Sequence, residues 1–113
     1  MSAPAPVTVC RLDELRPNTA TRFEVGRRAV AVIRIGDDVY AIGDTCSHAE
    51  ISLSEGELFC DSLELECWKH GSLFSIETGE PITLPATQPV PVYVARVVDG
   101  AVVIEIDVEG ASS

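Results

Sequence analysis

Residues 46–74, CSHAEISLSEGELFCDSLELECWKHGSLF, concentrate the chemistry of this 113-residue chain in two short segments. The first segment contains Cys46 and His48. The second contains Cys67 and His70, so each segment offers one thiol and one imidazole. Both histidines of the chain and three of its four cysteines lie here, and each pair follows an apolar run typical of a β-strand. We therefore expect two loops on a rigid sheet that present four ligands to one metal site.

Thiolate and imidazole ligands together favour zinc or iron over calcium or magnesium. A nucleophilic Cys–His dyad requires one such pair rather than two. Structural zinc modules more often place two residues between the ligands of a pair, whereas one residue separates Cys46 from His48. From the residues alone, a structural zinc-binding interaction module remains the alternative to an iron centre.

The composition is typical of a single globular domain, with 46% hydrophobic and 23% charged residues. The first nine residues, MSAPAPVTV, contain neither the basic segment nor the apolar stretch of a signal peptide. The longest wholly apolar run, residues 29–33, is far shorter than a membrane span. We therefore expect a cytoplasmic protein with reduced thiols and flexible tails at residues 1–5 and 109–113.

The formal net charge of −10 is unevenly distributed along the chain. Residues 1–40 contain six Arg against five acids, whereas residues 41–113 contain only Lys69 and Arg96 against thirteen acids. This balance argues against nucleic acid and membrane surfaces as partners. It is compatible both with a solvated surface and with a face that attracts a basic protein partner.

Strand signals dominate the sequence. β-branched and apolar runs occupy residues 22–25, 27–35, 39–42, 63–66 and 72–76. The turn Gly36-Asp37-Asp38 is expected to join the runs at 27–35 and 39–42 as a hairpin. Residues 12–15 could make one helical turn, and the Pro-rich residues 81–91 are expected to form an ordered loop. Because no segment keeps a helical periodicity over a dozen residues, the sequence predicts an all-β fold, a small antiparallel sandwich or barrel.

The C-terminal strands give the most specific pattern. Residues 92–98 and 101–108 flank Asp99-Gly100, a strong signal for a two-residue hairpin. The second of these runs alternates, which predicts one buried and one largely exposed face. The expected buried residues are Val102, Ile104, Ile106 and Val108, and the expected exposed ones are Ala101, Val103, Glu105 and Asp107.

The spacing Cys-x-His, eighteen residues, Cys-x-x-His resembles that of the Rieske iron–sulfur family. The resemblance extends through VYAIGDTCSHAEISLSEGEL (39–58) and LECWKHGSLFSIETGEPITLPATQPVPVY (65–93), and it covers most of the chain. It is to the small Rieske ferredoxins, and it implies a single Rieske domain over residues 1–113. Within that domain, a cluster-binding subdomain of two loops is expected at about residues 43–87.

The resemblance implies one 2Fe–2S cluster that is bound asymmetrically, with two Cys on one iron and two His on the other. Carried onto this chain, Cys46 and Cys67 are expected to bind the inner iron, and His48 and His70 the outer iron. Four further residues are expected to surround the cluster: Trp68 as a shield or as filler of a surface gap, Gly71 for a tight loop, Ser72 as a hydroxyl donor, and Pro85 in a covering proline loop.

The chain also departs from part of the family. The two extra cysteines of high-potential members correspond to Ile51 and Lys69, so the disulfide between the loops cannot form. Phe74 stands where those members have a hydrogen-bonding Tyr. These departures imply a low reduction potential. Cys10 and Cys60 match no family ligand and are expected to be reduced cysteines used for packing.

The function implied by the resemblance is that of a one-electron carrier rather than an enzyme. The chain has no room for the mononuclear iron domain of an oxygenase, and it contains no G-x-G-x-x-G pattern for a flavin or nicotinamide. The implied partners are a flavin-dependent ferredoxin reductase and a terminal non-haem iron oxygenase, with the carrier a monomer. A ferredoxin for iron–sulfur assembly is an alternative. A nitrite-reductase-like small subunit is another, against which the presence of all four ligands argues.

Overall fold

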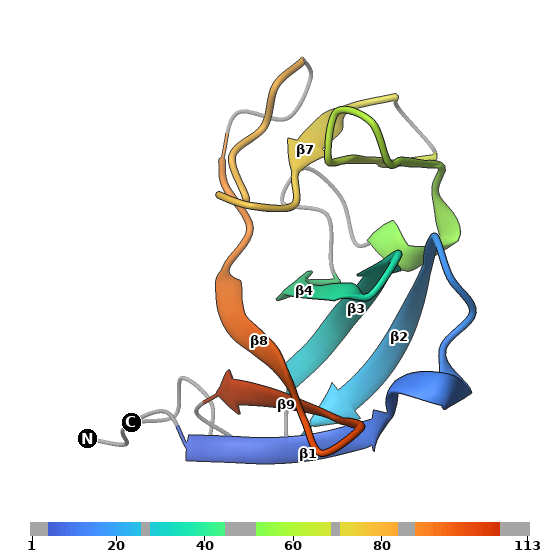
Figure 1. Ribbon diagram of the computed structural model, residues 1–113. Coiled ribbons are helices and arrows are strands. Elements are labelled where there is room, and N and C mark those ends of the chain that lie inside the picture. The colour runs from blue at the N-terminus through green and yellow to red at the C-terminus, as the bar shows by residue number, and fades with distance from the viewer. Residues whose placement is uncertain (1–4, 26–27, 45–51, 69–70, 84–87, 107–113) are drawn as a thin grey trace.

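The computed structural model describes residues 5–25, 28–44, 52–68, 71–83 and 88–106, and Figure 1 shows their arrangement. These residues form strands and short 3₁₀ turns without any α-helix, which confirms the all-β prediction. Within them, no helix is long and apolar enough to cross a membrane. The strands are β1 (Ala5–Arg11), β2 (Thr19–Val25), β3 (Arg28–Ile35), β4 (Asp38–Gly43), β5 (Leu58–Phe59), β6 (Glu64–Glu66), β7 (Leu73–Ser75), β8 (Val92–Val98) and β9 (Ala101–Ile106).

Six strands form one curled antiparallel sheet in the order β1-β9-β8-β4-β3-β2. Two of its connections are the predicted hairpins. Gly36 has φ +61° in the turn between β3 and β4, and Asp99 and Gly100 have φ 52° and 79° between β8 and β9. In the turn between β8 and β9 both central residues have positive φ, and the backbone twist of such a turn matches the twist of the paired strands. Residues 12–14 form the expected single helical turn, η1 (Leu12–Glu14).

Strand β9 departs from the predicted alternation at one residue. Val102, Ile104 and Ile106 are buried as predicted, but Val103 on the opposite face is only 9% exposed. β9 lies between β1 and β8 in the sheet, and Val103 is opposite Arg96 of β8. Arg96 also pairs with Glu105, so this ion pair lies on the same face of β9 as Val103. Residues 107 and 108 lie outside the described residues.

Two hydrophobic cores lie on opposite faces of β3. Val30 and Val32 belong to the core inside the curled sheet, which also contains Val102, Ile104 and Ile106. Their sequence neighbours Ala31 and Ile33 belong to a second core, whose other buried members are Ile42, Leu53, Leu65, Cys67, Phe74, Ile76 and Val90. Because alternate residues of a strand point to opposite faces, the continuous apolar run at 29–33 reflects a strand covered on both sides.

A second, three-stranded sheet, β5-β6-β7, is inserted between β4 and β8 and covers the second core (Figure 1). The antiparallel pair β5 and β6 forms the hairpin that the eighteen-residue spacing allows. A short 3₁₀ turn, η2 (Leu53–Glu55), leads into it. The chain enters this region after Gly43 and returns to the large sheet at Val92. The tails predicted at 1–5 and 109–113 lie outside the described residues, apart from Ala5, which begins β1.

Candidate metal centre

Cys67 is the only one of the four predicted ligands within the described residues. It follows β6 directly, is 0% exposed, and packs in the second core with Leu65 and Phe74. The other predicted ligands, Cys46, His48 and His70, lie outside the described residues, as does Pro85. In the part of the chain that is described, no group of three or more His, Cys, Asp or Glu is suited to hold a metal ion. This follows because three of the predicted four ligands are outside it.

The segment that carries the second Cys/His pair is closed by backbone hydrogen bonds. The Cys67 N–H donates to the Ser72 carbonyl at 2.7 Å, and the Gly71 N–H donates to the Cys67 carbonyl at 2.8 Å. Gly71 has φ +77°, in the left-handed region that side chains with a Cβ rarely adopt. Gly71 therefore has the backbone conformation that a tight turn requires, and hydrogen bonds join Gly71 and Ser72 to the buried Cys67.

Trp68 and Ser72 differ sharply in their surroundings. The Trp68 side chain is 52% exposed, so it does not fill a gap in the core. Ser72 is 0% exposed, which is unusual for a hydroxyl residue. The loop that starts at Cys67 thus contains an exposed ring near its start and a buried hydroxyl residue at its end.

The Pro-rich segment lies against this loop at its start. The Leu73 N–H donates to the Thr83 hydroxyl oxygen at 2.9 Å. The Thr83 hydroxyl in turn donates to the Gly71 carbonyl at 3.5 Å. The Ile82 N–H donates to the Leu73 carbonyl at 2.6 Å. Thr83 therefore joins the Pro-rich segment to the residues just after position 70. The sequence analysis did not identify Thr83, because a threonine between prolines carries no distinctive signal.

The end of the same segment is held by two glycines. The Val90 N–H donates to the Gly79 carbonyl at 2.8 Å, and the Gly43 N–H donates to the Pro91 carbonyl at 2.8 Å. A Cβ on Gly79 would lie 2.1 Å from the Val90 carbonyl oxygen. Both described ends of the Pro-rich segment are thus anchored. Its residues 84–87 lie outside the described part, so the ordered loop stays a prediction.

Asp44, directly after β4, joins the residues on either side of the segment with the first Cys/His pair. This residue is 0% exposed, and its carboxylate accepts hydrogen bonds from Ser52 and Ser54, beyond the segment. Sequence reasoning missed it. The available signal was an acid two residues before Cys46 together with the pattern Ser-x-Ser at 52–54, which is common in loops.

Gly56 allows the backbone after the first Cys/His segment to approach the backbone before the second, at Glu66. A Cβ at this position would lie 1.6 Å from the Glu66 carbonyl oxygen, so no other residue fits without a backbone shift. The Glu66 N–H donates to the Glu57 carbonyl at 2.9 Å across the same contact. The acid-Gly turn at 55–56 is therefore a point of close backbone approach, directly before Cys67.

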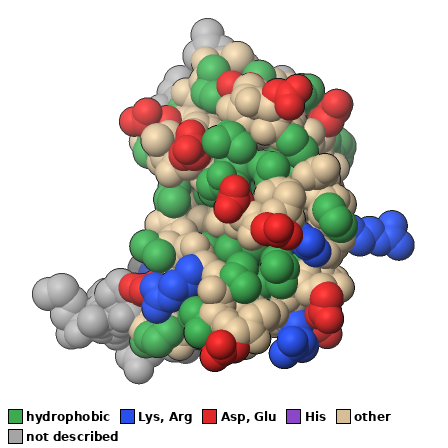
Figure 2. Space-filling model, viewed as in Figure 1, with side chains coloured by type: hydrophobic (Ala, Val, Ile, Leu, Met, Phe, Trp, Pro, Cys, Tyr) green, Lys and Arg blue, Asp and Glu red, His purple; other side chains and the backbone are tan. Residues whose placement is uncertain are grey.

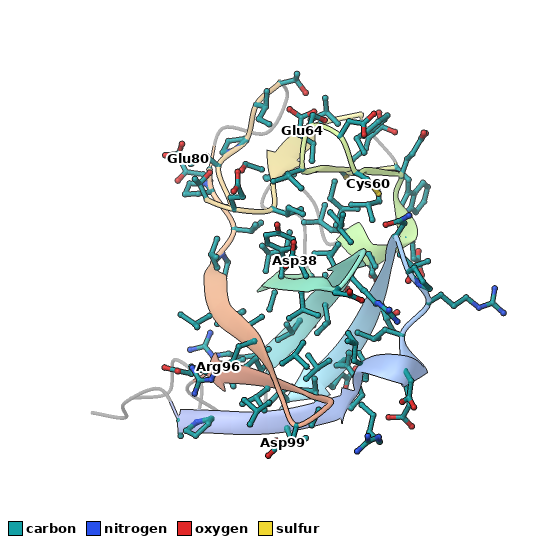
Figure 3. All side chains as sticks on the ribbon, in the orientation of Figure 1. Asp38, Cys60, Glu64, Glu80, Arg96 and Asp99 are labelled. Carbon is teal, nitrogen blue, oxygen red and sulfur yellow. The ribbon has the colours of Figure 1, made fainter. Side chains whose placement is uncertain are left out.

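Cys10 and Cys60, the two cysteines not predicted as ligands, lie in different surroundings. Cys10 is half-buried in β1 and packs against the core inside the curled sheet. Burial, and then the nearby Glu14 carboxylate, raise the pKa of the Cys10 thiol, which favours its protonated form. Cys60 is half-buried in the turn after β5, and Figure 3 places it in the region of the small sheet.

The end of the molecule that holds the small sheet is acidic. The described residues 52–68 and 71–83 contain neither Lys nor Arg. Figure 2 shows acidic side chains over this end and the basic ones on the other part of the face, and Figure 3 places Glu64 and Glu80 at this end, opposite Arg96. The acids of residues 52–68 and 71–83 are Glu55, Glu57, Asp61, Glu64, Glu66, Glu77 and Glu80.

The residues fit a Rieske cluster by the chemistry of the donor set and by the burial of Cys67. Two Cys and two His at this spacing supply the thiolate and imidazole ligands that such a cluster requires. Cys67 is buried in an apolar core, which suits a ligand of the inner iron. Solvent exposure is one of the factors that set the potential of such a cluster. The anchored loops supply the rigid support that ligands need.

Comparisons with known proteins agree with this chemistry. The family profile described as "Rieske [2Fe-2S] domain" matches residues 5–94. A relative named "Ferredoxin CarAc", from Metapseudomonas resinovorans, is 41% identical over 97 residues, which cover 85% of this chain and 89% of the relative.

Two solved structures are also similar. The "Ferredoxin of carbazole 1,9a-dioxygenase from Nocardioides aromaticivorans IC177" superposes with a TM-score of 0.85 at 42% identity, covering 88% of this chain and 96% of that one. A chain in the structure titled "Complex of reduced oxygenase and oxidized ferredoxin in carbazole 1,9a-dioxygenase" superposes with a TM-score of 0.80 at 40% identity, covering 88% and 92%. These relatives do not support the zinc alternative. The chain therefore belongs to the Rieske [2Fe-2S] domain family, and it is an electron carrier with one cluster of this type rather than an enzyme.

Proposed function

We propose that this protein carries single electrons from a flavin-dependent ferredoxin reductase to a terminal non-haem iron oxygenase. The observation that carries this proposal is the 40% identical chain found in a complex of a reduced oxygenase with an oxidized ferredoxin. That complex supports the oxygenase as the acceptor. The reductase is inferred from the role, since a carrier that gives electrons to an oxygenase must receive them from a donor.

The proposed ligands are Cys46 and Cys67 on the inner iron, and His48 and His70 on the outer iron. When bound, the cluster supplies one-electron chemistry, because its two irons accept and release a single electron between them. The burial of Cys67 supports its assignment to the inner iron. Within the single domain, the proposed cluster-binding subdomain extends over about residues 43–87.

The residues around the proposed ligands hold them in position and control what reaches them. The hydrogen bonds between Cys67, Gly71 and Ser72 fix the second loop, and Thr83 holds the Pro-rich segment against it. The exposed Trp68 and Ile82 place apolar side chains beside this loop, at 52% and 49% exposure. Such side chains suit the water-excluded centre of a protein contact.

The charge of this end of the molecule suits a basic face on the partner proteins. Exposed acids in the turns around the small sheet attract a partner of opposite charge and raise the encounter rate. The contact is transient, because a carrier must leave one partner before it meets the next. We propose that the carrier is a cytoplasmic monomer, since one small domain can then meet both partners with the same end.

The proposal is tested with the purified protein loaded with its cluster. Iron analysis and the visible spectrum come first: a red-brown protein with about two irons per chain is expected. The chemically reduced protein is then mixed without oxygen with the oxidised terminal oxygenase of a carbazole dioxygenase system. We expect rapid reoxidation that depends on oxygenase concentration. A colourless protein that holds zinc, or a cluster that no oxygenase of this class reoxidises, would contradict the proposal.

A further inference from the structure

Asp44 is a buried residue directly after β4 and directly before the segment 45–51, which contains Cys46 and His48. It is 0% exposed. Removing a carboxylate from water is costly unless the group is paired and hydrogen-bonded, and Asp is almost never fully buried without such partners. The partners of this carboxylate therefore indicate what its burial achieves.

Those partners come from the far side of the same segment. The Asp44 Oδ1 accepts a hydrogen bond from the Ser54 N–H at 2.9 Å, and Oδ2 accepts one from the Ser52 hydroxyl. The Asp44 carbonyl accepts a third from the Leu53 N–H at 2.6 Å. The Ser52 and Ser54 hydroxyl oxygens are themselves hydrogen-bonded at 2.9 Å. Together these bonds join the two ends of the segment 45–51.

The joined ends are also fixed to the large sheet. The Asp44 N–H donates to the Ala29 carbonyl of β3 at 3.0 Å. The Arg22 Nε of β2 lies 3.8 Å from Asp44 Oδ2, while a terminal nitrogen of Arg22 lies 3.2 Å from the exposed Glu24. Because Arg22 is about half exposed and shared between two acids, its ion pair contributes less than the hydrogen bonds to the closure.

We propose that Asp44 is a positioning residue for the cluster, because its carboxylate fixes both ends of the first ligand loop. The inference rests on the proposed ligands Cys46 and His48. A loop with fixed ends has fewer conformations, so its ligands spend less time away from the iron atoms that they bind. Removing the carboxylate should therefore loosen the cluster more than it loosens the fold, which two separate cores stabilise.

The test compares Asp44→Ala, Asp44→Asn and Ser52→Ala with Glu24→Gln, each loaded with its cluster. Glu24→Gln is the matched control, because it removes the other carboxylate beside Arg22 without touching the loop. Three quantities are measured: the rate of iron release to a chelator, the urea midpoint of unfolding, and the electron paramagnetic resonance spectrum of the reduced protein. Asp44→Ala should release iron at least about tenfold faster, since a hydrogen bond to a charged group corresponds to roughly that factor.

Asp44→Asn keeps an acceptor oxygen for the Ser54 N–H and should release iron at an intermediate rate. The Asp44→Ala spectrum should be shifted or broadened, and Glu24→Gln should match the wild type in release rate and spectrum. Wild-type release and an unchanged spectrum in Asp44→Ala would overturn the proposal, as would release that rises only in proportion to global unfolding. If Asp44→Ala does not fold, Ser52→Ala and Asp44→Asn carry the same comparison. A wild-type protein without iron would instead contradict the proposed function.

Discussion

At the residue scale, the burial of Cys67 separates it from the other described cysteines. Cys67 is 0% exposed in the second core, whereas Cys10 and Cys60 are half-buried. A buried thiol can be a small apolar side chain or a metal ligand. The spacing from Cys67 to His70 and the family match favour the ligand.

Ligand substitutions should therefore remove the cluster. We expect His48→Ala and Cys67→Ala to lose most of their iron and colour, because a cluster with four protein ligands is rarely retained with three. Cys60→Ser is the control and should keep both, with at most a modest loss of stability from a half-buried thiol. Iron per chain and visible absorbance measure the effect. Full retention of iron in both ligand variants would show that the ligand assignment is wrong.

The hydroxyl at Ser72 should raise the reduction potential. A donor toward a cluster sulfur stabilises the more negative, reduced form, and Ser72 is a buried hydroxyl beside the loop of Cys67. If that bond is worth about 1.5 kcal/mol, Ser72→Ala should lower the midpoint potential by roughly 60 mV. Phe74→Tyr should raise it if the new hydroxyl reaches a sulfur. Voltammetry measures both.

The control for this measurement is Ser75→Ala. The Ser75 hydroxyl accepts bonds from Glu77 and Thr78 in the turn that follows β7, so its loss should weaken that turn and leave the potential unchanged. Equal shifts in Ser72→Ala and Ser75→Ala would mean that the potential responds to general loosening rather than to a donor at position 72.

At the element scale, the two ligand segments and the Pro-rich segment are held by different devices. Asp44 joins the ends of the first, backbone bonds between Cys67 and Ser72 close the second, and Thr83 attaches the third to the second. Each device uses residues of the described sheet or turns next to the segment. We therefore propose that groups outside the Cys/His motif position the predicted ligands.

Thr83 offers a direct test of the contact between the Pro-rich segment and the second loop. Thr83→Val keeps the shape of the side chain and removes the acceptor for the Leu73 N–H, at a cost of about 1 kcal/mol. Hydrogen exchange in a peptide covering residues 71–76 should become about fivefold faster, and cluster loss should accelerate. Thr78→Val removes a hydroxyl that bonds only to the nearby Glu80 N–H among the described contacts, and it should leave this peptide unchanged.

The sequence predicted most strands and both hairpin turns, because alternation and the pairs Gly36-Asp37 and Asp99-Gly100 are local signals. It did not predict the burial of Val103, which lies on the face of β9 where Arg96 of the neighbouring strand pairs with Glu105. It also missed Asp44, Thr83 and the short strand β5. Each of these acts through a partner distant in sequence or through a few backbone bonds, which leave little trace in composition or periodicity.

At the scale of the whole molecule, the charge is divided between two ends. Described acids without a described Lys or Arg cover the end with the small sheet, whereas ion pairs at Arg11, Arg22, Arg34 and Arg96 involve the large sheet and its turns. The proposed cluster-binding subdomain is at the acidic end. One small domain thus combines a rigid base with an end suited to brief contacts.

Salt should slow electron transfer between this protein and its partners if the acidic end directs the encounter. Between about 20 and 500 mM salt, the screening length falls from tens of ångströms to a few, so the long-range attraction is lost. We expect the second-order rate to fall about tenfold or more over this range. Stopped-flow mixing of the reduced protein with the terminal oxygenase measures it. A rate that does not change would mean that the acids serve solubility only.

The potential of the cluster depends on several of these features together. Rieske centres span about −150 to +300 mV. The disulfide of high-potential members is absent because Ile51 and Lys69 replace its cysteines, Phe74 has no hydroxyl, and the surrounding acids oppose the added negative charge. Only Ser72 acts in the opposite direction. Three effects therefore lower the potential and one raises it.

Protein-film voltammetry of the wild-type protein at pH 7 tests the central claim most directly, because it detects both the cluster and the terms that set its potential. We predict a reversible one-electron wave with a midpoint below about 0 mV, toward the −150 mV end of the Rieske range. The absence of any wave from a fully loaded protein would contradict its role as an electron carrier. A midpoint above about +150 mV would contradict the proposed control of the potential by the missing disulfide, Phe74 and the acidic end.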